Sequence, residues 1–382
     1  MSDTNTEQRL GHSPVKVLIV CVAVAMFIYL LPNILFGLVK IRKRLHQPKN
    51  LSGLEKAMLI YGGNSEGKLP TAGDTSGLGR ITLNCRMPET DAELKYWLEN
   101  MIWYHGFSDA EVLEATGLAE EELAAAKKRC DIRHDNRPKT TGQDRLLVLP
   151  YPGGRHPRIG FLEGAIDPQR ETKFSVFTPW DAESYVVVDL PEAIWSNLGL
   201  TYLAHTHIDT IWTTQGIEMK KLEWKRGPDG TLEVERTLPN GIVFGAKVVA
   251  DKQAVHMTHW MKNGTKERLT DLRTQLCVMP KMAKGFEQQT KENKVHRKPY
   301  IACRSEDGKR WIITAWEACY RTWDNPDCPC FHSDPQFPDL EPGEKATLHG
   351  WFSFYEGEDI DEEIKQIEAT GWRKEDDVRA EK

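Results

Sequence analysis

Thirteen short runs with the residue pattern of β-strands follow one another between Leu146 and Gly357. They include the alternating TLEVERTL and the aromatic GWFSFY, and tight-turn sequences such as GPDG, PNG, EDGK and EPGE separate several of them. Turns of this kind between short apolar runs are typical of antiparallel strands joined as hairpins. The pattern therefore predicts a mainly β body over residues 146–357, either a large sandwich or a barrel.

Residues 90–130 have the period of a helix instead. The apolar positions of the first stretch fall on one helix face: Leu94, Trp97, Leu98, Met101 and Ile102. Ser108 can cap a second helix, and Gly117 makes a turn before a third. The outline is that of a helix-turn-helix, but three glutamates at residues 120–122 open the last helix, where a DNA reader needs basic and amide side chains. We predict a small helical hairpin that docks a protein partner.

The two ends of the chain have patterns of their own. Residues 17–39 form an uncharged apolar run of 23 residues, long enough to cross the roughly 30 Å hydrocarbon core as a helix. A tail of residues 1–16 precedes this run, and residues 40–89 contain a basic flank and a linker rich in glycine and polar residues. We predict a single-pass membrane protein in which residues 358–382 form a C-terminal helix and a charged tail.

The distribution of charge bears on orientation and on partners. Five basic residues lie between positions 40 and 49 and two precede the apolar run, so the positive-inside bias places the body in the cytoplasm. The net charge of −6 and the pI near 6.1 argue against the basic surface that a nucleic-acid binder needs. We expect no nucleic-acid partner, and small neutral or polar ligands stay open.

His205 and His207 stand at positions i and i+2 of the run LTYLAHTHI. On a strand both side chains project to the same face. Two neighbouring imidazoles can serve as general acid and base near neutral pH, or as two metal ligands. We predict a catalytic pair with Glu317 as its carboxylate partner. The alternative is that the histidines make buried hydrogen bonds at a sheet edge.

A set of charged and aromatic residues suggests a substrate-binding surface. Arg155 lies in the turn PGGRHPR, and Arg170 and Glu171 lie in the loop sequence PQRETK. An arginine fork suits bidentate binding of carboxylates or of vicinal sugar hydroxyls. Flat indole faces stack on sugar rings, which makes three of the twelve tryptophans candidates for a binding platform: Trp180, Trp212 and Trp316. For the charged residues the alternative is an ion-pair network that holds two loops together.

Cysteine and histidine are concentrated near residue 330. Cys328, Cys330 and His332, with Cys319 shortly before them, could form a tetrahedral zinc site. The spacing C-x-C-x-H lacks the usual C-x-x-C knuckle, so a disulfide or buried thiols are the preferred prediction. Zinc is the alternative, and no other cofactor is predicted.

Two longer segments carry a resemblance to a known family. In DGTLEVERTLPNGIVFGAKVVADKQAVHMTHWMKNGT a hairpin leads into a strand ending in WMKNGT, and LEPGEKATLHGWFSFYEG supplies a Pro-Gly turn before a last long strand. This rhythm resembles the galactose mutarotase-like supersandwich of aldose 1-epimerases and several carbohydrate-active enzymes, over residues 146–357. The resemblance implies a two-sheet antiparallel sandwich with a sugar-binding groove on a concave sheet. No catalytic motif of an aldose epimerase is matched, so no catalytic role is carried over.

Three functions are compatible with these observations. The first is a membrane-anchored carbohydrate-active protein that acts on or binds a sugar or glycan, in the manner of an aldose epimerase. The second is a non-catalytic module that binds a glycan or a protein. The third is a metal-dependent hydrolase that uses His205 and His207, because LAHTHIDT resembles the H-x-H-x-D-H motif of metallo-β-lactamase-like enzymes, with Thr210 in place of the last histidine.

Overall fold

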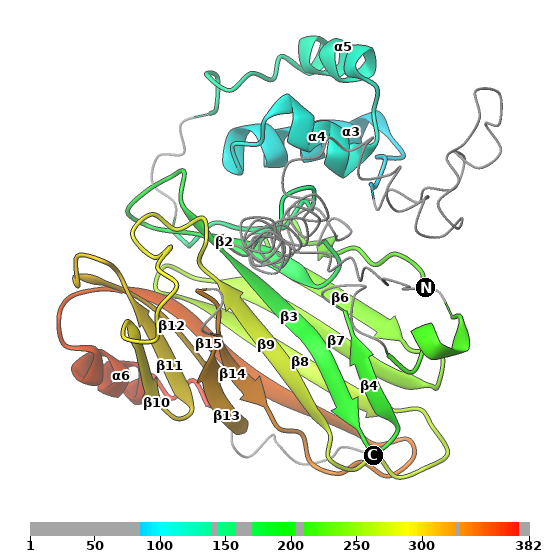
Figure 1. The fold of residues 1–382 in the computed structure, drawn as a ribbon, viewed down its shortest axis with the longest axis vertical. Coiled ribbons are helices and arrows are strands. Elements are labelled where there is room, and N and C mark those ends of the chain that lie inside the picture. Colours follow the sequence, from blue (N-terminus) through cyan, green and yellow to red (C-terminus); the bar gives the residue numbers. More distant parts are fainter. Residues whose placement is uncertain are drawn as a thin grey trace, which may run out of the picture. The chain divides into compact units, whose positions relative to one another are not determined.

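The computed structural model describes residues 85–138, 144–157, 170–203, 210–217, 219–325 and 329–373. Most of this part of the chain is antiparallel β-structure with few helices, arranged as two sheets (Figure 1). The predicted membrane segment, residues 17–39, lies outside it. Of the helices that are described, none has the length and the apolar character needed to cross a membrane.

The elements follow one another along the chain in this order. The helices are α3 (Asp91–Leu98), the π-helix η3 (Glu99–Tyr104), α4 (Asp109–Thr116), α5 (Glu120–Cys130), the 3-10 turn η4 (Thr213–Gln215) and α6 (Ile360–Ala369). The strands are β1 (Val148–Pro150), β2 (Lys173–Phe177), β3 (Tyr185–Ser196), β4 (Gly199–Tyr202), β5 (Lys225–Arg226), β6 (Leu232–Thr237), β7 (Ile242–Ala250), β8 (Ala254–Asn263), β9 (Arg273–Met279), β10 (Lys294–Arg297), β11 (Tyr300–Arg304), β12 (Arg310–Trp316), β13 (Cys319–Asp324), β14 (Phe331–Pro335) and β15 (Lys345–Glu356).

The strands form a seven-stranded and an eight-stranded sheet. The first has the order β1-β2-β3-β9-β14-β13, with β4 paired to β3, and the second has the order β10-β11-β12-β15-β8-β7-β6-β5. One apolar core joins the two sheets, because Phe174 and Val188 of the first pack in the same cluster as Phe244 and Phe352 of the second. The prediction of a mainly β, antiparallel body is confirmed, and of the two architectures left open it is the sandwich that forms.

Several hairpin turns lie where their residues predict them. The sequence GPDG connects β5 to β6, and PNG connects β6 to β7. Gly241 in the second turn has a φ of 98°, in the left-handed region that glycine tolerates best. A Cβ at this position would also lie 2.6 Å from the carbonyl oxygen of Gly264, so the close approach of two turns requires a residue without a side chain.

The helices over residues 91–130 lie where the apolar period predicts them. Ser108 caps α4 with a capping box completed by Glu111, and Gly117 ends this helix in the left-handed conformation. The unit rests on the first sheet through side-chain contacts. The amide of Asn100 donates to the carbonyl oxygen of Pro150 at 3.0 Å, and Nε2 of His105 lies 2.7 Å from the hydroxyl of Ser175.

The C-terminal helix covers part of the second sheet on the side away from the sandwich core. Ile360, Ile364 and Ile367 of α6 pack in one cluster with Trp311 and Trp351 of β12 and β15. Figure 1 shows α6 beside β10 and β11. The three isoleucines recur at helical spacing, so the apolar face that the sequence predicts is the face that is buried.

Candidate functional site

A cavity of about 730 Å³ lies between the segment that leads into α3 and the loop before β5. Its volume falls within the range of small-molecule sites, roughly 300–1,000 Å³. We call it the arginine groove, and it is lined by residues 85–90, Glu93, Trp97, Arg170, Lys221, Glu223, Trp224 and Arg226. The groove therefore combines cations, carboxylates and two indoles on its walls, which are the groups that recognise polar ligands.

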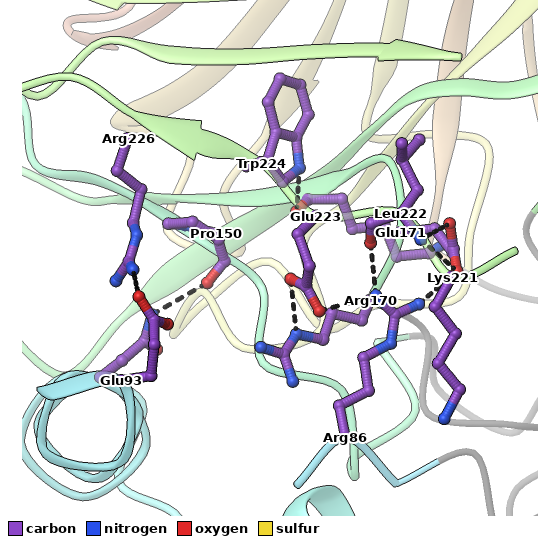
Figure 2. Close-up of polar contacts among 12 residues, drawn as sticks. Arg86, Glu93, Pro150, Arg170, Glu171, Lys221, Leu222, Glu223, Trp224 and Arg226 are labelled. Carbon is purple, nitrogen blue, oxygen red and sulfur yellow. Dashed lines mark hydrogen bonds and ion pairs between the residues drawn. The ribbon is translucent and has the colours of Figure 1, made fainter. Parts of the chain in front are cut away.

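Arg170 is the buried cation of the groove. Its side chain is 6% exposed, and its guanidinium stacks on the indole of Trp97 at 3.5 Å from the ring centroid. Nε donates to the carboxylate of Glu223 at 3.1 Å. Nη1 and Nη2 have no hydrogen-bond acceptor among the residues that the structure describes, and Figure 2 shows this end of the side chain turned away from Glu223. Arg170 thus presents unused donors to the groove.

The electrostatic surroundings of Arg170 are unfavourable to its charge. Burial lowers the pKa of Arg170 to about 10, the Glu223 carboxylate opposes this shift, and the neighbouring Arg86 guanidinium adds to it. Glu223 is also shared, because its other oxygen accepts from Nη1 of Arg86 at 2.7 Å. One carboxylate therefore serves two guanidiniums, and an additional negative or strongly accepting group in the groove would stabilise the pair.

Glu171 belongs to an ion-pair network beside the groove. Its carboxylate accepts from Nη2 of Arg86, from Nη2 of Arg236 at 2.9 Å and from the backbone N–H of Leu222 at 3.0 Å. Figure 2 shows Arg86 between Glu223 and Glu171. The oxygens of Glu171 accept hydrogen bonds from the protein itself. This is the ion-pair network between loops that the sequence suggested as the alternative to substrate binding.

The hydrogen-bond donors of Arg155 are likewise used by other residues of the protein. Nε and Nη2 make a bidentate contact with the carboxylate of Glu111, at 2.6 and 2.9 Å, and Nη1 donates to the hydroxyl of Tyr185 and to the carbonyl oxygen of His105. Burial opposes protonation of this arginine, but Glu111 outweighs it and the pKa of Arg155 is raised. The side chain joins α4 to β3 and shares none of these partners with Arg170.

The three tryptophans predicted to form a binding platform, Trp180, Trp212 and Trp316, do not lie on one surface. Trp212 is 3% exposed and its Nε1 donates to Thr201 at 2.9 Å within the core, so no ring face is open to a sugar. Trp180 is half-buried and lies in a stacked arrangement with Phe286. Trp316 is fully buried in the core between the sheets. None of the three lines the arginine groove.

The packing of Trp316 predicts a clear effect of a single methyl group. Gly350 is its partner in the register of β12 and β15, and a Cβ added to Gly350 would lie 2.8 Å from the indole ring. Because neither strand can retreat from the sandwich core, Gly350→Ala is expected to destabilise the fold by about 1–3 kcal/mol, the usual cost of overpacking. Urea unfolding of both proteins measures this difference, and a change below about 0.5 kcal/mol would show that the core accommodates the methyl group.

The predicted catalytic residues are not brought together among the described residues. His205 and His207 lie outside them, so the acid–base pair stays a prediction. The Glu317 side chain is fully buried, and its carboxylate accepts from the backbone N–H of His349 at 2.6 Å and lies 2.9 Å from Nδ1 of the same histidine. Of the predicted zinc ligands, Cys328 is outside the described part, whereas Cys330 directly precedes β14 and His332 is its second residue.

Most residues that line the groove could not be recognised from the sequence. Trp97 was assigned to the buried stripe of a helix, and it is indeed 5% exposed, but its face supports Arg170. Arg86 was assigned to a linker. Its partners Glu171 and Glu223 are 85 and 137 positions away, so no local pattern marks it.

Comparisons with known proteins give no family. No protein-family model matches the sequence, and a search of curated proteins found no relative. Similar solved structures include a protein described as a kojibiose phosphorylase from the human microbiome, with 9% identity and a TM-score of 0.30 over 51% of this chain and 27% of that chain. They also include the Slr1438 protein from Synechocystis sp. PCC 6803, with 10% identity and a TM-score of 0.30 over 59% of this chain and 99% of that chain. The chain spans about a quarter of the kojibiose phosphorylase. TM-scores this low carry no functional conclusion.

Proposed function

We propose that this protein binds a sugar or glycan in the arginine groove, and that Arg170 contacts the ligand. The observation that carries the proposal is the state of Arg170: a guanidinium buried on Trp97, with two nitrogens that have no acceptor among the described residues and a cavity of about 730 Å³ beside them. Arg170 also shares the Glu223 carboxylate with Arg86, so a ligand oxygen in the groove would give these nitrogens an acceptor that the two guanidiniums do not have to share. A buried guanidinium in this state is typical of a binding site.

The groove favours a ligand rich in hydroxyl or carboxylate oxygens. Its lining residues include four cations, Arg86, Arg170, Lys221 and Arg226, against three carboxylates, Glu89, Glu93 and Glu223. Planar guanidiniums bind carboxylates and vicinal hydroxyls through two parallel hydrogen bonds. Within the sugars, an acidic one such as a uronate is therefore expected to bind more tightly than its neutral counterpart.

Anchoring and catalysis are the further parts of the proposal. The apolar run at residues 17–39 would hold the β body at a membrane, with the body on the cytoplasmic side, as the basic residues that follow the run suggest. Turnover, in the manner of an aldose epimerase, would require His205 and His207 as acid and base. Binding without turnover would be the function if these two histidines take no part.

Calorimetric titration of the full-length protein with a panel of neutral and acidic sugars tests this function. Arg170→Gln is expected to weaken binding at least about tenfold, since a charged hydrogen bond contributes about 1.5–3 kcal/mol. Arg170→Lys keeps the charge but loses the fork, so it should restore only part of the affinity. Arg268→Gln, a change at an arginine whose side chain is 57% exposed and which does not line the groove, is the matched control and should bind as the wild type does.

Two results would refute the proposal. One is the absence of binding by any sugar of the panel at millimolar concentration. The other is full affinity in an Arg170→Gln variant that melts at the wild-type temperature. Anomer interconversion measured on the same samples, with a His205→Ala, His207→Ala double variant, separates an epimerase from a binding protein.

A further inference from the structure

Three side chains of metal-ligand type meet where β9 and β14 pair. The register Phe331↔Val278 places Cys277 directly across from His332, and Cys330 lies two positions before His332 on the same face. The alternate residues Val278 and Phe331 point the other way, into the sandwich core. Cys277, Cys330 and His332 are therefore on the outer face of the first sheet, and all three are at most 1% exposed.

The distances between their donor atoms are those of a metal site. Nε2 of His332 lies 3.5 Å from Sγ of Cys330 and 3.8 Å from Sγ of Cys277, and the three donor atoms all lie within 4.8 Å of one another. Zinc binds sulfur at about 2.3 Å and nitrogen at about 2.05 Å. With these bond lengths the sulfur and the nitrogen are about 3.6 Å apart at a tetrahedral S–Zn–N angle and about 3.8 Å apart at a trigonal one. Both observed nitrogen-to-sulfur separations agree with this range.

The hydrogen bonds of His332 prepare it as a ligand. Nδ1 lies 3.0 Å from the carbonyl oxygen of Leu276, which can only accept, so the ring hydrogen is on Nδ1. Nε2 then carries the lone pair and faces the two sulfurs. The ring is held flat against the indole of Trp323, at 3.8 Å and an interplanar angle of 6°, and Glu192 lies 4.0 Å from Nδ1. An outer hydrogen bond from the second ring nitrogen is the usual arrangement of a metal-bound histidine.

We propose that Cys277, Cys330 and His332 bind a thiophilic metal ion, with zinc as the ion that best matches their charge. Two thiolates neutralise a divalent ion, so the site would carry no net charge in surroundings where an unbalanced charge is costly. The described residues supply three ligands, and Cys328, the further cysteine that the sequence suggested, lies outside them.

The site differs from the zinc alternative read from the sequence. Cys319 lies next to the hydroxyl of Ser333, with Sγ and Oγ 3.4 Å apart, and Ser333 alternates with His332 on the opposite face of β14. Cys277, 53 positions before Cys330, joins two of the predicted ligands, and the third, Cys328, lies outside the described residues. Met279, across from Cys330 in the same register, adds a thioether sulfur to this face. Thioether ligands prefer monovalent copper, so copper is the alternative ion for this site.

Metal analysis of the full-length protein, purified without chelators from cells supplied with zinc and copper, tests the site. One ion per chain is expected by plasma mass spectrometry, and its identity separates zinc from copper. Cys277→Ser, Cys330→Ser and His332→Gln are each expected to lose the ion. Cys303→Ser removes another fully buried thiol, in the core between the sheets, and should keep it.

Substitution of cobalt for the native ion keeps the test valid if a variant fails to fold. Wild-type protein loaded with cobalt is expected to show the sulfur-to-metal charge-transfer absorption of thiolate ligands. Three results would overturn the proposal: wild-type protein that retains neither zinc nor copper and takes up no cobalt, retention of the ion in the folded Cys277→Ser and Cys330→Ser variants, or a thiol titration that finds these two cysteines joined as a disulfide. None of these outcomes depends on sugar binding in the arginine groove.

Discussion

Lys173→Met is expected to destabilise the fold by about 3–5 kcal/mol, because it leaves a buried carboxylate without its cation. Nζ of Lys173 lies 2.6 Å from the carboxylate of Asp189, and the two side chains are 1% and 0% exposed. The other oxygen of Asp189 accepts from the hydroxyl of Thr172 at 2.6 Å. Burial raises the pKa of Asp189, Lys173 opposes this shift, and Glu192 adds to it, so loss of the lysine leaves two carboxylates that repel each other.

Chemical unfolding of three variants measures the effect. Lys173→Met combined with Asp189→Asn should recover much of the lost stability, because the uncompensated charge is removed. Lys247→Met, at an exposed position of β7, is the control and should change the free energy of unfolding by no more than about 0.5 kcal/mol. Equal stability of Lys173→Met and the wild type would mean that the pair contributes nothing.

Acidification from pH 7 to pH 5 is expected to destabilise the protein by about 2 kcal/mol for each of two buried histidines. Burial lowers the pKa of His105 to about 3 and that of His259 to about 4. In the unfolded chain both titrate near pH 6.5. Below pH 6.5 the two histidines are therefore protonated in the unfolded state but stay neutral in the folded state. The free energy of unfolding that they contribute above pH 6.5 is lost as the pH falls.

His105 allows this contribution to be isolated. Its Nδ1 lies 2.9 Å from the carbonyl oxygen of Asn100 and its Nε2 lies 2.7 Å from the hydroxyl of Ser175, so both ring nitrogens are used by the neutral form. His105→Gln is expected to flatten the decline of stability between pH 7 and pH 5 by about 2 kcal/mol. His134→Gln changes an exposed histidine and should leave the slope as it is. Urea unfolding at pH 7, 6 and 5 decides between these results.

The architecture was predictable where local residue chemistry controls it. The capping box of Ser108 and the glycine turns between strands act over a few positions, so they can be recognised without knowledge of the fold. The hairpin of β13 and β14 was not predicted, because its local residues lack a strand pattern. Pro326, Pro329 and Pro335 interrupt its alternation, and β14 is a strand because it pairs with β9 rather than because of its own residues.

The candidate sites were less accessible because their partners are far apart in the sequence. Arg170 could be proposed as a binding residue from its type and its loop, but not the indole of Trp97 beneath it. The histidine and one cysteine of the proposed metal site were recognised, whereas Cys277 becomes a neighbour only through the register of two strands. Trp212 and Trp316 illustrate the reverse case, since their residue type suggested a surface and the fold uses both as core.

Arg86 connects the helices to the β body, so a force transmitted to this residue would act on both. Its backbone N–H donates to the carbonyl oxygen of Ala115 in α4 at 2.9 Å, while its side chain is held by Glu171, Glu223 and the carbonyl oxygen of Leu222. A pull on the chain from the N-terminal side would reach this residue before it reached α3. At Arg86 the force would be divided between the helices, through its backbone N–H, and the β body, through its guanidinium. Because the Arg86 side chain is only 6% exposed, salt would screen these ion pairs weakly, and the attachment should keep its strength at high ionic strength.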